Sequence, residues 1–116
     1  MKASYLKFRN EDGKIHSGSV LDESVGKFLK FQLEKDCNSS ATEYSTWGYT
    51  FGMKIKNMKY LINVGFMETP RYLQIRINPI PTFWQTIFSF YNTERKELLD
   101  KVGELVERNF PNLKKM

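Results

Sequence analysis

Cysteine and histidine are almost absent from this chain, which has one of each, Cys37 and His16, in 116 residues. A single cysteine cannot form an internal disulfide, so the composition gives no sign of an oxidising compartment. Structural zinc sites usually need four Cys or His ligands, and a catalytic triad needs a histidine beside its nucleophile. We therefore predict neither kind of site, expect His16 to be a surface residue, and expect no metal or other cofactor.

Long apolar runs and phosphate-binding loops are also missing. No stretch approaches the ~20 apolar residues that span a bilayer, and residues 1–10 hold too many polar side chains for a signal peptide. Gly48 and Gly52 lie within a strand pattern rather than at a strand-to-helix turn, where glycines would cradle a phosphate. We predict a cytoplasmic, non-enzymatic protein that forms one domain over residues 1–116.

Three segments between residues 46 and 78 alternate between apolar and polar side chains, which is typical of strands with one buried face. Loops at residues 57–58 and 68–71 would join them as an antiparallel sheet, in which Phe51 pairs with Val64 and Val64 with Ile75. The apolar rows predicted to face the core are Trp47, Tyr49, Phe51, Met53 and Ile55, then Tyr60, Ile62, Val64 and Phe66, then Leu73, Ile75 and Ile77.

The opposite face of this predicted sheet is glycine-rich and polar. In the same register Gly52 lies beside Asn63 and Arg76, and glycines within strands often mark the close approach of a ligand or another backbone. Curvature or bulges in a solvated face are the alternative explanation. If the face is a site, the glycines form its floor, and its contact residues are Asn63, Met67, Tyr72, Gln74 and Arg76.

Two segments have helical periodicity. Residues 19–36 and residues 92–110 each repeat apolar side chains at a spacing of three and four, with charged residues on the other side. Pro111 is expected to end the second helix. The spacing also predicts ion pairs on that helix, Glu97 with Lys101 and Glu104 with Arg108.

Shorter signals surround these elements. Residues 4–9 alternate as a strand does, and a turn at residues 10–13 would let residues 14–16 pair back as a hairpin. Residues 37–41 are polar and are expected to form a loop. Pro79 is expected to stop the third strand, because proline cannot donate a hydrogen bond to a sheet.

An aromatic segment follows the predicted sheet. Residues 82–91 hold Trp84 and Phe88 among other apolar side chains at helical spacing, which favours a short helix. Its apolar groups cover more than one face. Either the segment is packed between other elements, or part of it is a partner-binding or homodimer patch.

Together these elements predict an α+β fold, in which an antiparallel sheet of three central strands, extended or not by the N-terminal hairpin, carries two main helices on one face. The order of a helix, three strands and a helix resembles double-stranded-RNA-binding domains, which begin their second helix with clustered lysines. Residues 93–97, Thr-Glu-Arg-Lys-Glu, depart from that pattern. In size and layout the chain is also similar to small bacterial toxin-neutralising, immunity-like proteins.

The net charge of +5 is spread along the chain, with its main excess in the sheet region. From these observations we expect a protein-binding module that uses the open sheet face or the aromatic segment 82–91, in which Trp84 and Phe88 would be the anchors. One alternative is nucleic-acid binding, with stacking on Tyr72 and cations at Lys54, Lys56, Lys59 and Arg76. Another is a small-ligand pocket between residues 79–91 and the sheet.

Overall fold

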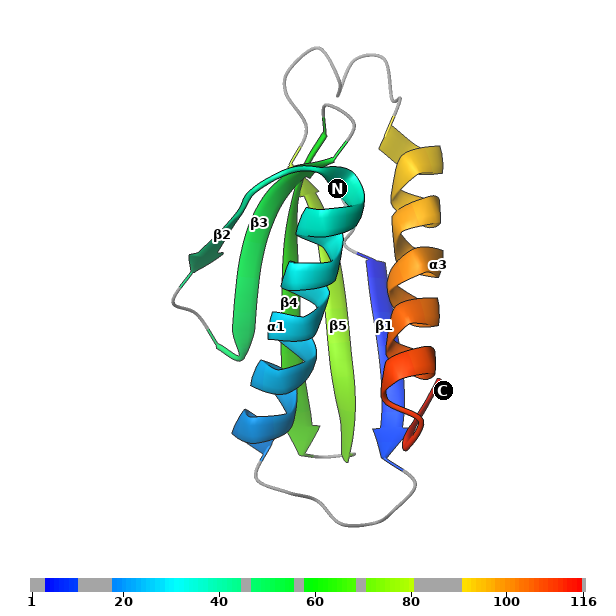
Figure 1. Ribbon diagram of the computed structural model, residues 1–116. Coiled ribbons are helices and arrows are strands. Elements are labelled where there is room, and N and C mark those ends of the chain that lie inside the picture. Colours follow the sequence, from blue (N-terminus) through cyan, green and yellow to red (C-terminus); the bar gives the residue numbers. More distant parts are fainter. Residues whose placement is uncertain are drawn as a thin grey trace.

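The computed structural model describes residues 4–10, 18–44, 47–55, 58–68, 71–80 and 91–115. In these residues the fold is α+β, with two helices and a six-stranded antiparallel sheet in the order β2-β3-β4-β5-β1-β6 (Figure 1). The elements are β1 (Ser4–Asn10), α1 (Gly18–Cys37), β2 (Ala41–Tyr44), β3 (Tyr49–Ile55), β4 (Met58–Glu68), β5 (Arg71–Ile80), α3 (Tyr91–Asn109) and β6 (Leu113–Lys115).

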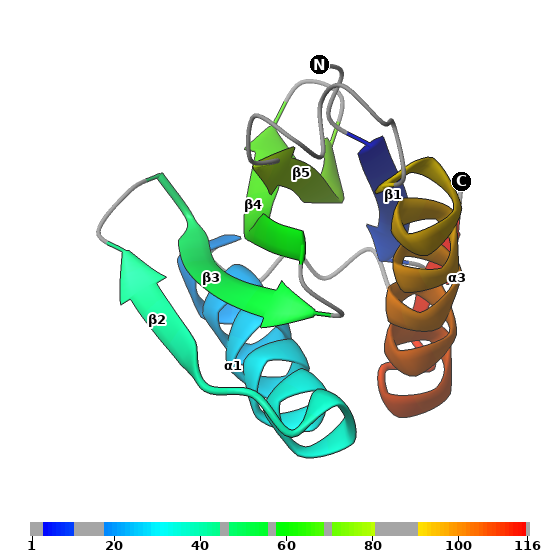
Figure 2. The same ribbon diagram turned by 90° about the horizontal axis from the view of Figure 1, so that it is seen from above.

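Both helices lie on the same face of the sheet, α1 across β3 and β4 and α3 beside β1 and β6 (Figures 1 and 2). The core lies between these two layers. Its fully buried side chains come from the apolar rows of the central strands and from the helix stripes. They include Phe8, Val25, Leu29, Leu33, Phe51, Tyr60, Ile62, Val64, Leu73, Ile75, Ile77, Val102 and Val106.

Close packing explains a glycine in the middle of α1. A Cβ atom on Gly26 would lie 2.3 Å from the ring of Tyr49, so only glycine lets the first residue of β3 approach the helix this closely. The Tyr49 hydroxyl donates a 2.5 Å hydrogen bond to Glu43 of β2. Burial, followed by this carboxylate, raises the pKa of Tyr49. Tyr49 of β3 therefore contacts both α1 and β2 and links these three elements.

The two helices also contact each other. Phe28 of α1 packs edge-on against Phe110, the residue that follows α3, with ring centroids 5.4 Å apart. Lys101 of α3 forms a 3.2 Å ion pair with Asp36 of α1. The sequence predicted Glu97 as the partner of Lys101, but the approach of α1 provides a carboxylate from outside the helix.

The predicted strand register is confirmed on one side of β4 and wrong on the other. Val64 pairs with Ile75 as expected, but Phe51 pairs with Ile62 rather than Val64, a shift of two residues. The cause is Met58, which was assigned to the turn but is buried as the first residue of β4. A shift of two keeps each side chain on its predicted face, because the strand period is two.

Strand ends differ from the prediction in three places. Strand β2 begins at Ala41, where a loop was expected, and the short strand β6 was not predicted. Strand β5 continues through Pro79 to Ile80. A proline is tolerated here because the described pairing with β1 ends at Ile77, which leaves β5 with β4 on one side only.

The N-terminal strand is confirmed, but its neighbours were not foreseen. Strand β1 pairs with β5 along one edge and with β6 along the other. Residues 14–16, expected to complete a hairpin, lie outside the described residues. Four strands separate the two helices, rather than the three on which the resemblance to double-stranded-RNA-binding domains rested.

Within the described part of the chain, no helix has the length and apolar character to cross a membrane.

Candidate binding face

The face of the sheet turned away from α1 and α3, here called the open face, is basic. Side chains alternate between the two faces of each strand, so the residues between the core positions of the strands point to the open face. No described Asp or Glu side chain is among them, because the carboxylates lie on the helices or, like Glu43, turn toward α1. The cations of the open face are Lys7, Arg9, Lys54, Lys59, Arg76 and Lys114.

Two glycines of the open face are covered by aromatic rings. A Cβ atom on Gly65 would lie 2.3 Å from the ring of Trp47, and one on Gly52 would lie 2.9 Å from the ring of Tyr44. The expectation of a bare glycine floor is therefore wrong at these two positions. Each glycine leaves room for a ring to lie against the backbone, so the rings become part of the surface.

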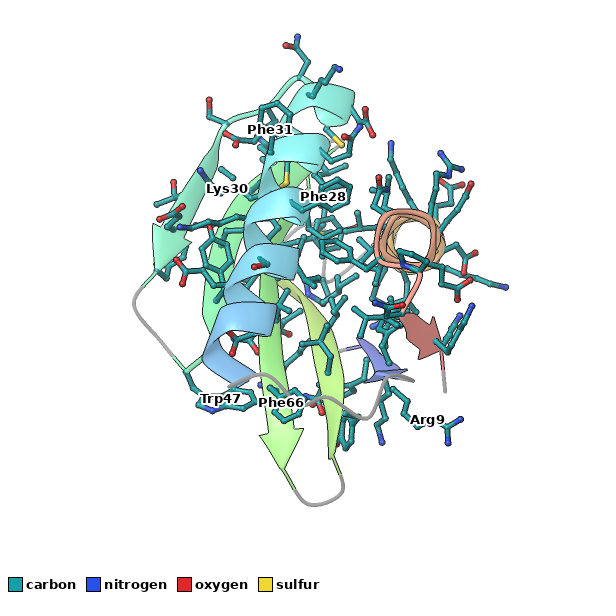
Figure 3. All side chains as sticks on the ribbon, turned by 60° about the horizontal axis from the view of Figure 1, so that its bottom comes forward. Arg9, Phe28, Lys30, Phe31, Trp47 and Phe66 are labelled. Atoms are coloured by element: carbon teal, nitrogen blue, oxygen red, sulfur yellow. The ribbon has the colours of Figure 1, made fainter. Side chains whose placement is uncertain are left out.

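Trp47 was predicted to face the core, but the structure places it on the open face, with 57% of its surface exposed. The cause is Gly48, which has a φ of 72°, in the left-handed region that favours glycine. This residue breaks the strand alternation, so β3 begins only at Tyr49. The side-chain amide of Asn63 then donates 2.7 Å hydrogen bonds to the Trp47 carbonyl and to the Thr50 hydroxyl. Figure 3 shows Trp47 at the end of the sheet where β3 begins.

Two more rings lie beside cations on this face. Lys7 of β1 is 5.2 Å from the ring centre of Tyr72, and Arg76 of β5 is 5.9 Å from the ring of Tyr5, which is itself half exposed. Both contacts follow from the antiparallel pairing of β1 with β5, which sets Tyr5 opposite Arg76. The Tyr72 hydroxyl donates a 3.3 Å hydrogen bond to Gln74. Cations and rings are thus interleaved.

A hollow of about 300 Å³ opens on this face next to Trp47. We call it the Trp47 hollow. Its floor is formed by β3, β4 and β5, and its walls combine an indole and a leucine with amide, hydroxyl and guanidinium groups. The lining residues are Trp47, Thr50, Leu61, Asn63, Gln74, Arg76 and Asn78.

The structure brings together part of the predicted site. Tyr72, Gln74, Arg76 and Asn63 share the open face, and Lys54 and Lys59 form a directly opposed pair at one end of it. The register shift moves every described row of β3. Gly52 lies beside Leu61 and Asn78, and Thr50 takes its predicted place beside Asn63 and Arg76. Backbone pairing sets Met67 opposite Tyr72, but its side chain lies outside the description. The remaining predicted residues, Lys56, Trp84 and Phe88, also lie outside the described residues, as does most of the segment expected to cover a small-ligand pocket.

Several residues of this face were not predicted as site residues: Tyr5, Lys7, Arg9, Tyr44, Trp47, Asn78 and Lys114. For the first strand a signal exists, because Tyr5, Lys7 and Arg9 alternate with the core residues Leu6 and Phe8. The pairing partner of that strand could not be read from the pattern, since it is set by contacts distant in sequence. Among the described residues, no group of three or more His, Cys, Asp or Glu side chains could hold a metal ion.

Comparison of the chain with protein-family models, with curated proteins and with solved structures gives no match.

Proposed function

We propose that this protein binds single-stranded nucleic acid on its open face. The observation that carries the proposal is the separation of charge, with cations on the open face and the described carboxylates on the helix side. Cations that neutralise phosphates release counterions, which drives sequence-independent binding. A face without carboxylates adds no repulsion to a polyanion.

Exposed rings favour a single strand over a duplex. Trp47 and Tyr44 lie against glycines and Tyr5 lies beside Arg76, and all three are exposed, so they are available to unpaired bases. Tyr72, beside Lys7, is partly buried. Bases in a duplex are already stacked, whereas unpaired bases gain about 1–3 kcal/mol each by stacking on an aromatic side chain. The major groove of a duplex admits a single helix, whereas a broad sheet face is too wide to enter either groove.

Protein binding, the function expected first from the sequence, is the second candidate. It would use the same side chains, since Trp, Tyr and Arg are the residues that most often dominate protein interfaces. The observation in its favour is the exposure of Trp47 next to Arg76. The charge of the face would then require an acidic partner surface. Salt dependence and preference for unpaired bases distinguish the two candidates.

The test is fluorescence anisotropy with labelled single strands of about 20 nucleotides, RNA and DNA, and with the matching duplexes, over a range of salt concentrations. We expect the single strand to bind more tightly than its duplex. For single strands the affinity falls with salt, with a log–log slope of about 0.7 per phosphate neutralised. Binding that is unaffected by salt, or no binding at low salt, would remove the proposal and leave the protein partner.

A pair of charge reversals locates the surface. Lys59→Glu changes an exposed residue of the open face, and Lys96→Glu makes the same change on α3. We expect the first variant to weaken binding several-fold and to reduce the salt slope by at least about 0.7, because one phosphate contact is lost. The second should bind as the unmodified protein does. Equal losses in both would show that net charge, rather than the open face, drives binding.

A further inference from the structure

We infer that the Trp47 hollow holds one unpaired nucleobase of the bound strand, stacked on the indole of Trp47. This inference rests on the proposed function and assigns it a ligand group and a position. General electrostatic binding needs only cations, which lie over the whole open face. The hollow is a separate feature, because its lining combines an indole with amide, hydroxyl and guanidinium groups.

Three neighbouring residues set the position of Trp47, whose indole forms one wall of the hollow. Gly48 turns the chain so that Trp47 reaches the open face, Gly65 leaves space beneath the indole, and Asn63 fixes the Trp47 carbonyl with a 2.7 Å hydrogen bond. An aromatic side chain that is positioned in advance loses little conformational entropy on binding, and that increases the affinity gained from stacking. With 57% of its surface exposed, Trp47 is accessible to a ligand.

The polar groups of the hollow suit the edge of a base. Asn78 has no hydrogen-bond partner within the described part of the chain, and Arg76 offers its guanidinium donors. The amide oxygen of Gln74 accepts a hydrogen bond from Tyr72, so its amide nitrogen is the group left for a ligand. Together these side chains provide donors and acceptors on one face of the sheet, which are the groups that recognise base edges. A volume of about 300 Å³ is at the lower end of the range for small-ligand sites and has room for a single base.

Cations flank the hollow, and their positions favour a nucleic-acid strand over a free base as its ligand. The opposed pair Lys54 and Lys59 lies two residues along the strands from the row that contains Leu61 and Asn78. Lys7 lies on the neighbouring strand, opposite Gln74. The phosphates on either side of a seated base would therefore each meet a cation.

The experiment uses an abasic strand, in which the sugar–phosphate chain is kept and the bases are absent. One version has no base, and a second has a single base at its centre. We expect the single base to raise the affinity about tenfold, within the range for one base–aromatic stack. Trp47→Ala should abolish this gain while leaving the affinity for the abasic strand unchanged, and Trp47→Phe should retain most of it.

Matched controls separate the hollow from general effects. Phe31→Ala removes another exposed aromatic ring, on the outer side of α1 (Figure 3), and should leave the gain unchanged. Asn78→Ala should reduce the gain without removing the stacking ring. Circular dichroism of each variant checks that it folds, and the Trp47→Phe and Asn78→Ala variants carry the test should Trp47→Ala not fold.

The outcomes separate this inference from the proposed function. If the abasic strand binds in a salt-dependent way but one base adds nothing, the hollow takes no base, and the inference fails while the proposed function stands. If neither these strands nor ordinary single strands bind at low salt, the proposed function fails. If a free nucleoside monophosphate binds as tightly as the single-base strand, the hollow is a mononucleotide site, and the assignment to a strand is overturned.

Discussion

Glycine acts at the level of single residues in this protein by making room for aromatic rings. Gly26 admits Tyr49 against α1, Gly52 admits Tyr44, and Gly65 admits Trp47. A strand or helix glycine costs stability because it loses more conformational freedom on folding than other residues do. The cost is offset at these positions by ring contacts that no other residue type allows.

Gly65→Ala tests the seat of Trp47. Its new Cβ would lie 2.3 Å from an exposed ring, and we expect the ring to move away while the fold is kept. The unfolding free energy should change by less than about 1 kcal/mol, as for other changes that leave the core intact. Tryptophan emission should shift to longer wavelength, and the shift should be missing in a Trp47→Phe background, which isolates Trp47 from Trp84. Unchanged emission would show that Trp47 does not rest on Gly65.

Gly103→Ala is the matched control for this substitution. Its Cβ would lie 3.7 Å from Leu6, an ordinary contact distance. Because Gly103 is in the interior of α3, alanine should stabilise the protein by about 0.5–1 kcal/mol. The pair therefore separates the effect of alanine on the backbone from the clash with a ring.

At the level of elements, β4 is the centre of the fold. It pairs with β3 on one side and β5 on the other, and its apolar row faces the helix layer, where α1 packs on it. Val64, fully buried, lies between Tyr49 and Ile75 of the neighbouring strands.

Val64→Asp should unfold the protein at neutral pH. An unpaired buried carboxylate costs several kcal/mol, which is comparable to the total stability of about 5–15 kcal/mol expected for a domain of this kind. Lys59→Asp adds the same side chain to an exposed position of the same strand and should leave the cooperative melt intact. Thermal unfolding followed by circular dichroism distinguishes them. A cooperative melt of Val64→Asp like that of the unmodified protein would contradict the burial of this face.

The contact between α1 and α3 predicts a dependence of stability on pH. A hydrogen-bonded ion pair with Lys101, then a hydrogen bond from Gln32, hold the pKa of Asp36 below its ordinary value of 3.8. A lowered folded-state pKa contributes stability above the unfolded value, and that contribution is lost as the pH falls through the folded value. Asp36→Asn should therefore be less stable than the unmodified protein at neutral pH, and the difference should close below about pH 4.

Denaturant unfolding at several pH values measures this difference. Asp100→Asn is the control, because it removes the same charge from an exposed residue of α3 that has no ion pair within the described part of the chain. A difference for Asp36→Asn that persists unchanged into acid would show that the amide disturbs packing rather than an ionic contact.

At the level of the whole molecule, the layers of the fold separate the charges. The helices hold acidic and basic residues in mixed order, whereas the described charged side chains of the open face are all basic. A net charge of +5 spread along the sequence is in itself a weak indication of nucleic-acid binding. Collected on one face and interleaved with rings, the same charges form the proposed site.

Local patterns determined much of the fold. The period of two marked the core rows of β3, β4 and β5, and helical spacing marked α1 and α3, because side-chain direction repeats with backbone geometry. The expectation of an α+β fold is confirmed by two helices and an antiparallel sheet. Even the incorrect register between β3 and β4 kept each residue on its predicted face.

Tertiary structure alone decided which strands are neighbours and what lies over the glycines. The pairing of β1 with β5 and β6 joins residues far apart in sequence, so no local pattern determines it. Trp47 fitted a core row by alternation, and only the left-handed Gly48 and the space above Gly65 placed it on the open face. A side-chain pattern gives the face of a residue only while the strand geometry is regular, and it loses that information where a glycine changes the backbone direction.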